Sequence, residues 1–537
     1  MKTVDAYSWT KKCTMPQRLN NIKRIFGKRG SQNYSVFLCK DMHPKTFGII
    51  GFCLSLSLCA FSQKKAEFTP ACQEAYHQML SLKIDPALKT LQKEKLNDPD
   101  NVIPYFLENY ADFFLLFFNE SAADLKTRKA NKELRIKLLQ ELPSSHPFRD
   151  LGQAIIRLHW ATVNLKFNNR WEAGWDLKAA YSLARENEKR FPAYDLNGMI
   201  IGPMQLAASS VPSSLRWLAN LVGIKGSMAE GNTNFLRFMN SNDEWAKIFR
   251  DEGIFYQCYI LQYMLNQPDK ALQEIETHEL DIVNNHLFAY MAANLNLVNK
   301  KSWVSQKIIS QRNRSSEYLN TTAWDFEMGS AKLYRLDPDA IAYFQRFLNN
   351  FKGNYYRKDA WLKLGYAYLM SGNFNQYKAC MQKVIGEGSA NTDADRRALK
   401  EARLGLMPNL TLLGARLLSD GGYANDALKT LSTKKTTDFR TPGERLEFLY
   451  RLGRIYDDLG QYDRALNSYT ATINAGKTST EYFAARAALQ AGLIHENRGN
   501  CSQAMRFYQL CIDMKNHDYE ESLEHRAKAG INRCSKN

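Results

Sequence analysis

Apolar residues recur at intervals of three and four along almost the whole chain after residue 70. This spacing places them on one side of an α-helix, whereas the alternation typical of half-buried β-strands is scarce. Breaks containing Gly, Pro or Asn divide the pattern into helix-turn-helix units. The pattern therefore predicts an all-α fold, and the succession of units predicts an α-solenoid in which helix pairs stack on one another.

An internal repeat is clearest in the second half of the chain, where Gly414, Gly453 and Gly492 recur at equal intervals. A Gly in the first helix and an Ala in the second let two helices approach closely, and large residues fill the space around that contact. Each pair leaves an apolar face that its neighbour covers, so the repeat predicts a stack. The last two units share these positions: Gly453 and Gly492, Gly460 and Gly499, Ala465 and Ala504, Tyr469 and Tyr508.

The stretch from Met42 to Ser62 has the three parts of a signal peptide, namely a basic start, an apolar run and a small-x-small end. Cleavage is expected before Gln63. The apolar run, residues 47–61, is shorter than the roughly 20 residues of a membrane-spanning helix. Residues 1–41 carry nine Lys or Arg against two Asp, and we interpret them as an upstream extension that builds no core. The alternative is a cytosolic protein with a basic tail.

These observations divide the chain into four parts. We expect a disordered extension at 1–41, a signal peptide at 42–62, a degenerate helical domain at 63–320 and a regular repeat solenoid at 321–537. The signal peptide predicts an exported protein in the periplasm or at the outer membrane.

Charge and cysteine content refine the picture only slightly. The formal net charge is +17, and the segment 1–62 contributes +8 of it. The remaining excess is mild, and no block of like charges is interleaved with stacking aromatics, so we expect no nucleic-acid partner. Cys501 begins one predicted helix and Cys534 ends the next, and an antiparallel return would bring them together. A disulfide between them is a hypothesis.

The sequence contains no motif for catalysis or for a cofactor. A phosphate-binding loop ending in Gly-Lys-Ser/Thr, His-Glu-x-x-His, Cys-x-x-Cys and Gly-x-Ser-x-Gly are all missing. His517, Glu521 and His525 are spaced four apart, but they extend over about 12 Å of helix, too far for one ion. We predict no catalytic residue, no metal and no cofactor, and hence no enzyme. A polar pocket between repeats is the alternative that linear sequence leaves open.

The segment beginning at Trp361, with Leu364, Gly365 and Tyr368, has the first-helix signature of a tetratricopeptide repeat. The chain resembles exported bacterial tetratricopeptide-repeat proteins, specifically from Trp361 to Tyr508 and in general character elsewhere. The middle segment is also similar to the eukaryotic inclusion-body clearance family of repeat proteins, which implies shared architecture. That similarity rests on Gly198, Ser210, Pro212, residues 218–223, Gly226 and Gly231.

The first resemblance implies a concave groove, lined by first-helix residues, that binds a protein or peptide partner. The chaperone-tail clamp of some family members is not implied, because it needs Lys and Asn at positions held here by other residues. Carried over to this sequence, the groove positions are Leu362, Tyr366, Leu369, Tyr450, Arg454, Asp457, Arg486, Leu489, Leu493 and Glu496.

Residues 198–226 form a second candidate surface, because their apolar side chains exceed what two short helices normally bury. The excess predicts peripheral membrane contact, a partner helix, or burial against neighbouring repeats. The side chains concerned are Met199, Ile200, Ile201, Met204, Leu206, Trp217, Leu218, Leu221 and Val222.

The sequence as a whole favours an exported, non-enzymatic scaffold or assembly factor that binds another protein. The alternative is a surface protein that captures nutrients or glycans, since some glycan-binding lipoproteins are also built on tetratricopeptide helices. That alternative calls for a lipid-modified Cys and a cluster of exposed aromatic residues.

Overall fold

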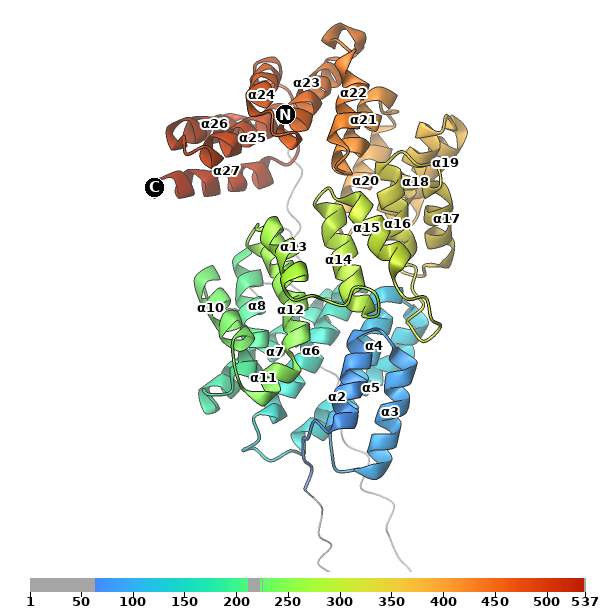
Figure 1. Cartoon of the computed structure of the whole chain (residues 1–537), viewed down its shortest axis with the longest axis vertical. Helices are drawn as coiled ribbons and strands as arrows, with labels where there is room; N and C mark the ends of the chain where they lie inside the picture. Colours follow the sequence, from blue (N-terminus) through green and yellow to red (C-terminus); the bar gives the residue numbers. More distant parts are fainter. Residues whose placement is uncertain (1–62, 211–222, 225, 536–537) are drawn as a thin grey trace, which may run out of the picture. The chain divides into compact units, whose positions relative to one another are not determined.

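The computed structural model describes residues 63–210, 223–224 and 226–535, and these residues form helices joined by turns (Figure 1). Within these ranges no strand occurs, and the only β-type pairing is an isolated bridge between Lys65 and Asn101. The predicted all-α solenoid is confirmed. The predictions for residues 1–41 and 42–62 lie outside the described residues.

The first half of the chain contains helices of very unequal length. A short turn of 3-10 helix, η1 (Asp195–Asn197), precedes α8, and a π-helical turn, η3 (Ile260–Met264), follows α12. The helices are α2 (Pro70–Leu80), α3 (Ile84–Asn97), α4 (Ile103–Asn119), α5 (Ala122–Gln140), α6 (Phe148–Lys166), α7 (Arg170–Arg190), α8 (Gly198–Ser210), α10 (Met228–Met239), α11 (Glu244–Ile248), α12 (Arg250–Tyr259), α13 (Pro268–Thr277), α14 (His286–Val298) and α15 (Ser302–Gln311).

The second half follows a more regular plan of consecutive antiparallel helices (Figure 1). A short 3-10 turn, η4 (Thr436–Asp438), precedes α23. The helices are α16 (Ala323–Tyr334), α17 (Ala340–Asn350), α18 (Arg357–Met370), α19 (Phe374–Gly386), α20 (Asp393–Leu404), α21 (Leu410–Asp420), α22 (Ala424–Ser432), α23 (Pro442–Asp458), α24 (Tyr462–Gly476), α25 (Phe483–Asn497), α26 (Cys501–Asp513) and α27 (Glu520–Cys534).

The repeat glycines explain how each helix pair closes. A Cβ atom added to Gly453 would lie 2.5 Å from the ring of Tyr469, and one added to Gly492 would lie 2.5 Å from the ring of Tyr508. Both tyrosines are fully buried. The helices of each pair are therefore too close for any other residue at the glycine. Gly460 follows α23 in the left-handed region, with φ of +69°, which favours glycine where a helix ends.

Hydrophobic packing divides the described residues into several cores. One large core includes buried residues from Cys72 to Met328, whereas the repeats after it have smaller cores of their own, the first of which begins at Leu333. Small successive cores are what a solenoid produces, since each unit mainly contacts its neighbours.

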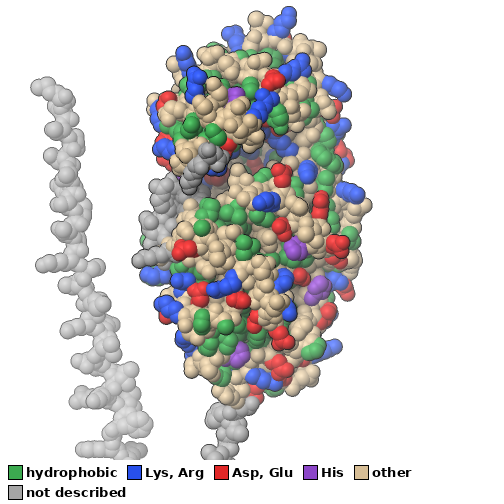
Figure 2. Space-filling view, turned by 60° about the vertical axis from the view of Figure 1, so that its left-hand side comes forward, with side chains coloured by type: hydrophobic (Ala, Val, Ile, Leu, Met, Phe, Trp, Pro, Cys, Tyr) green, Lys and Arg blue, Asp and Glu red, His purple; other side chains and the backbone are tan. Residues whose placement is uncertain are grey.

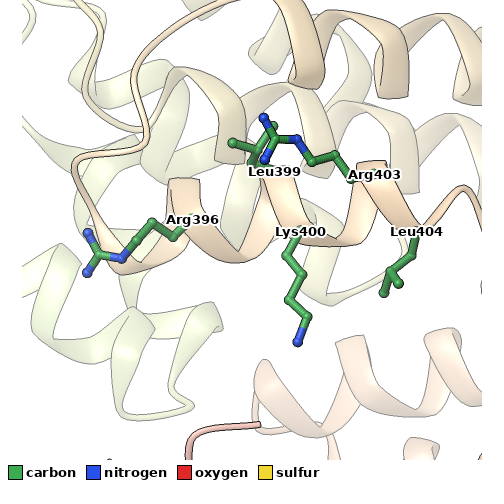
Figure 3. Close-up of a pocket in the computed structure, with 5 residues that line it drawn as sticks. All are labelled: Arg396, Leu399, Lys400, Arg403 and Leu404. Atoms are coloured by element: carbon green, nitrogen blue, oxygen red, sulfur yellow. The ribbon is translucent and has the colours of Figure 1, made fainter. Parts of the chain in front are cut away.

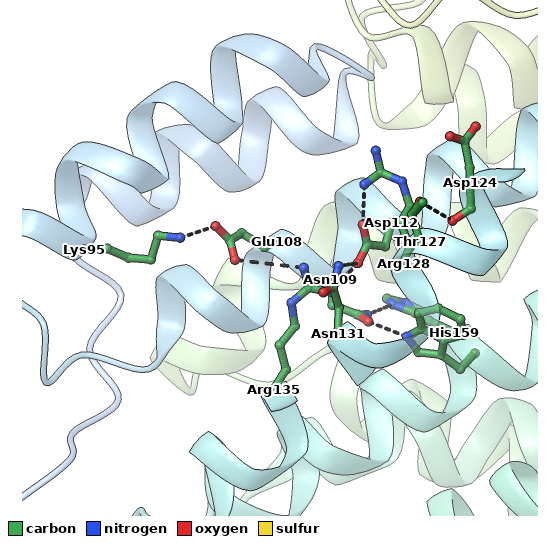
Figure 4. Close-up of polar contacts among 11 residues, drawn as sticks. Lys95, Glu108, Asn109, Asp112, Asp124, Thr127, Arg128, Asn131, Arg135 and His159 are labelled. Atoms are coloured by element: carbon green, nitrogen blue, oxygen red, sulfur yellow. Dashed lines mark hydrogen bonds and ion pairs between the residues drawn. The ribbon is translucent and has the colours of Figure 1, made fainter. Parts of the chain in front are cut away.

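The large core is crossed by polar networks as well as apolar packing. Asp112 of α4 is almost completely buried, and three residues of α5 contact it: Arg128 and Arg135 by ion pairs and Asn131 by a hydrogen bond of 3.0 Å (Figure 4). A buried carboxylate is tolerated when it is paired and hydrogen-bonded in this way.

A contact distant in sequence joins the turn between α14 and α15 to the repeats. The Ser302 hydroxyl donates to the Gly421 carbonyl at 2.8 Å. A Cβ at Gly422 would come within 1.8 Å of the Lys300 carbonyl, so only glycine fits there. The Lys300 ammonium then reaches Asp458 at the end of α23, at 2.6 and 2.7 Å.

Candidate functional site

The predicted groove positions on α18 are buried. The exposed fractions of Leu362, Tyr366 and Leu369 are 0, 3 and 0 %. The cause is α20, which packs along α18: the Tyr366 hydroxyl donates to Glu401 of α20. The prediction that these three residues line an open surface is therefore wrong for this structure.

Two positions in the following repeats are buried as well. Tyr450 is 3 % exposed, and its ring lies 5.4 Å from that of Phe483 on α25. Leu489 is 1 % exposed and belongs to the core shared by the last helices. These first-helix residues serve packing between repeats, so they also do not present a surface.

The other groove positions are partly exposed, and those of α23 carry charge. Arg454 forms ion pairs with Asp457 at 3.4 Å and with Asp458 at 3.6 Å. Asp457 also accepts a hydrogen bond from the Tyr469 hydroxyl at 3.0 Å. Burial raises the pKa of Asp457, although the charge of Arg454 counteracts that effect. Since Lys300 shares Asp458, the two carboxylates serve two cations.

The positions on α25 are covered on one side by the last helix. Glu496 accepts hydrogen bonds from Arg533 of α27 at 2.6 and 2.9 Å. The Arg533 contact is the largest influence on Glu496 and holds the pKa of this carboxyl below its ordinary value. Leu493 is partly buried against the core, and Arg486 is partly exposed.

The structure adds Arg526 of α27, a residue that sequence reasoning missed. Desolvation lowers the pKa of Arg526, and the charges of Arg486 and then Arg454 lower it further. The guanidinium groups of Arg454 on α23 and of Arg486 on α25 are therefore each close enough to Arg526 to repel it. We call Arg454, Arg486 and Arg526 the arginine cluster.

Positive charge in the arginine cluster is not fully neutralised. Among the described residues, neither Arg486 nor Arg526 makes a side-chain hydrogen bond or an ion pair, and the buried Nε of Arg486 is left without an acceptor. Arg526 is nevertheless exposed to solvent. Unpaired guanidinium groups that solvent can reach are suited to bind carboxylates.

A signal that α27 continues the repeat, and so could contribute Arg526, was present in the sequence. The interval from Gly492 to Gly530 is almost the same as the interval between the repeat glycines Gly453 and Gly492. A Cβ at Gly530 would lie 2.4 Å from the ring of Tyr508, so this glycine packs on the same tyrosine as Gly492. The helix α27 thus continues the series of first helices.

The two cysteines considered for a disulfide do meet. Cys501 begins α26, Cys534 ends α27, and the Cys501 thiol is close enough to influence the pKa of Cys534. Burial is the largest cause that raises the pKa of Cys534 to about 11, followed by the neighbouring Cys501 thiol. Both are free thiols in the structure, so the disulfide itself stays a prediction.

The candidate surface at 198–226 is largely explained by packing. Met199, Ile200, Ile201 and Leu206 are fully buried, and Met204 is 5 % exposed. The helix α8 packs closely against α10, as the alternative of burial against neighbouring helices predicts. These five residues are not available to a membrane. The remaining apolar residues of the segment, Trp217, Leu218, Leu221 and Val222, lie outside the described residues.

Within the described ranges, no group of three or more His, Cys, Asp or Glu side chains could hold a metal ion. His517, Glu521 and His525 therefore do not form such a group. No helix in those ranges is both long and apolar enough to cross a bilayer. On the face shown in Figure 2, acidic and basic side chains are interspersed.

Comparison with known proteins identifies two segments. Residues 359–387 and 450–518 each match a family model described as tetratricopeptide repeat. No curated protein matches the chain. One solved structure that it is similar to is the "Crystal structure of APC/C hetero-tetramer Cut9-Hcn1", at 12 % identity over 83 % of this chain and 87 % of that chain, with a TM-score of 0.27.

The two matched segments coincide with α18–α19 and with the region from α23 to the turn before α27. Tetratricopeptide repeats generally bind protein partners. The arginine cluster begins in the second of these segments and ends in the helix that follows it.

Proposed function

We propose that this chain is an exported, non-enzymatic scaffold or assembly factor that binds an acidic segment of another protein through the arginine cluster. The observation that carries the proposal is the set of three arginines from successive first helices, of which two have no carboxylate partner among the described residues. A carboxylate between Arg486 and Arg526 would relieve their repulsion and form charge-assisted hydrogen bonds. Export and a place in the periplasm or at the outer membrane are supported by the signal-peptide pattern of residues 42–62.

Charge reversal tests this proposal. The full chain with Arg486→Glu and Arg526→Glu is used beside wild type to capture partners from cells, and captured proteins are quantified by mass spectrometry. We expect the specific partners to be lost, because two cations become two anions. Arg506→Glu is the matched control, since Arg506 is an exposed arginine of α26 without a hydrogen bond or ion pair among the described residues.

Unchanged capture by the double variant, with the control also unchanged, would refute the role of the cluster. Partners that are lost equally in both variants would show a general charge effect instead. Added salt provides a second test, because attraction between partly exposed charges weakens as ionic strength rises. Capture of the partners should therefore decrease as salt is added.

Glycan capture is the second candidate function, and one observation favours it. Trp171 and Trp175 lie one turn apart at the start of α7 and are 67 and 58 % exposed. Large exposed aromatic faces are suited to stack on ligands that are apolar on one side and polar on the other. Quenching of tryptophan fluorescence by oligosaccharides, lost in Trp175→Ala, would support this function, and no response would count against it.

A further inference from the structure

A second surface, separate from the arginine cluster, lies where α20 ends and the loop to α21 begins. Four apolar side chains are exposed there: Leu404 by 60 %, Leu406 by 72 %, Met407 by 54 % and Leu410 by 41 %. Leu404, Leu406 and Met407 line one depression and are therefore contiguous, and Leu410 follows them closely in sequence. We call these four residues the α20 patch.

Folding does not account for the α20 patch. The helix packs on its neighbours through the other side, where Asp395, Ala398 and Ala402 are buried. Gly405 has φ of +66° and no atom within 4 Å of a Cβ, so the chain turns there in open space. Single exposed apolar residues are ordinary, but a contiguous exposed group marks an interaction site.

One depression beside the patch has a size that suits a single side chain. A depression of about 180 Å³ is lined by Leu404, Leu406 and Met407, with Leu413 and Glu447 among its other walls. Small-molecule sites usually enclose about 300–1,000 Å³. One apolar anchor from a partner would fill a depression of this size.

The surroundings of the patch are basic. Arg396, Lys400 and Arg403 lie on the exposed surface of α20, on the turns that lead up to Leu404 (Figure 3). Among the described residues Arg403 makes no hydrogen bond or ion pair, whereas Lys400 pairs with Asp518 and Arg396 with Asp393.

The acidic residues of α20 already have partners, although Glu401 also lines the depression. Asp395 accepts from the backbone N–H groups of Tyr356 and Asp359 at 2.9 and 3.1 Å, and Glu401 accepts from the Tyr366 hydroxyl. The solvent-facing surface after the first turn therefore combines exposed leucines with cations. Charge complementarity calls for a partner that is apolar on one side and acidic beside it.

We propose that the α20 patch binds an amphipathic acidic helix of a partner protein. The apolar side of that helix would cover Leu404, Leu406 and Met407 and insert one side chain into the depression. Carboxylates along its flank would pair with Arg403 and Arg396. This is the helix-in-groove mode of recognition, in which side chains three and four positions apart supply the anchors.

Fluorescence anisotropy with the purified full chain tests the proposal. The probe is a labelled 18-residue peptide of Leu and Glu with its leucines on one helical face, and the comparison peptide has Lys in place of every Glu. We expect saturable binding of the Glu peptide only. Leu404→Ser combined with Leu406→Ser and Met407→Ser should weaken binding at least tenfold, and Arg403→Glu should weaken it severalfold.

Two matched controls keep the result specific. Leu96→Ser alters an equally exposed leucine on α3, at 78 % exposure, and Arg506→Glu alters an exposed arginine on α26. Both should bind like wild type. The substituted residues of the α20 patch are exposed, so the fold is expected to survive their replacement.

Several outcomes would overturn the proposal. Equal binding of the Glu and Lys peptides would remove the charge argument. Loss of binding in Arg486→Glu but not in the patch variant would place the peptide at the arginine cluster. Dimerisation of wild type that the patch variant abolishes would make a second copy of the chain the occupant. Binding of anionic phospholipid vesicles without binding of the Glu peptide would make a membrane the occupant of the patch.

Discussion

Glu252 of α12 is a buried carboxylate on which four helices converge, and its removal is predicted to loosen the N-terminal core. Tyr76 of α2 and Tyr110 of α4 each donate to it at 2.7 Å, and Tyr256 donates to its other oxygen. His159 of α6 lies 3.8 Å away through Nε2. The network therefore joins α12 to helices that precede it by a long way in the sequence.

The hydrogen-bond pattern also assigns the proton of His159. The Trp160 indole N–H donates to the Asn109 carbonyl oxygen at 3.0 Å, which fixes the orientation of that amide. The Asn109 amide nitrogen then donates to His159 Nδ1 at 2.9 Å (Figure 4). Nδ1 is thus an acceptor, so Nε2 carries a hydrogen, and the Glu252 carboxylate lies 3.8 Å from it, beyond hydrogen-bond distance.

Tyr110→Phe removes one hydrogen bond of this network, the one from the Tyr110 hydroxyl to Glu252. A hydrogen bond to a charged group contributes about 1.5–3 kcal/mol, so the variant should lose that much local stability. Glu252→Gln leaves several buried donors with too few acceptors, and a broken buried network costs about 3–5 kcal/mol. Tyr263→Phe is the matched control, because Tyr263 is 58 % exposed and its loss should change stability by less than about 0.5 kcal/mol.

Hydrogen–deuterium exchange read on peptides of α12 is the suitable assay, because a chain with several cores does not unfold in one step. At about 1.4 kcal/mol for each factor of ten, Tyr110→Phe should speed exchange about 10- to 150-fold. Equal exchange in Tyr110→Phe and Tyr263→Phe would refute the reasoning, since it would mean that the buried network adds no net stability.

The pH dependence of stability provides an independent test of the same carboxyl. Burial alone would raise the pKa of Glu252, but the neighbouring His159 imidazole and the hydroxyls of Tyr256 and Tyr110 outweigh it and hold the pKa below the ordinary value of a glutamate. A depressed pKa in the folded state stabilises the protein above the unfolded pKa, and this contribution is lost as pH falls through the folded value. Exchange in α12 should therefore accelerate below about pH 4.5 in wild type, and less so in Glu252→Gln.

Two further predictions concern the last repeats. Gly492→Ala places a Cβ against the Tyr508 ring and should destabilise α25 and α26 by about 1–3 kcal/mol in the same exchange assay. Gly386→Ala is the control and should not destabilise its helix, because the space around Gly386 is open. Equal effects of the two substitutions would contradict the close packing of Gly492 on Tyr508. Oxidation of Cys501 and Cys534 to a disulfide should lower the mass of the chain by about 2 Da, because two hydrogens are lost when the bond forms. The bond should also stabilise α26–α27 by about 3–4 kcal/mol. Identical masses and identical exchange with and without reductant would exclude the disulfide.

The fold could be predicted wherever helix contacts depend on residues at a fixed spacing. The pairs Gly453 with Tyr469 and Gly492 with Tyr508 identified the helix pairs, because only a glycine allows such a close approach. The antiparallel return of α27 on α26, which brings Cys534 to Cys501, followed from helix lengths alone. These are local relations, and sequence periodicity records them directly.

The candidate site could be predicted less well, because it depends on contacts between units. Tyr366 holds a groove position in the repeat frame, yet α20 lies outside that frame and covers it. Residues 198–206 are too apolar for one repeat on its own, and the structure buries them by packing α8 on α10. Arg526 was not predicted because α27 keeps only the repeat glycine and lacks the rest of the signature.

Photo-crosslinking in intact cells from a benzoylphenylalanine at position 493 tests directly whether an acidic segment of a partner binds at the arginine cluster. Leu493 of α25 holds the same position in its repeat as Arg454 and is partly exposed, whereas Leu510 of α26 is exposed and serves as the control position. We expect a crosslink from position 493 to a peptide rich in Asp and Glu, and we expect it to be lost in the double variant Arg486→Glu with Arg526→Glu. The same crosslinks from position 510, or a crosslink from position 493 to a peptide without acidic residues, would contradict binding at the arginine cluster.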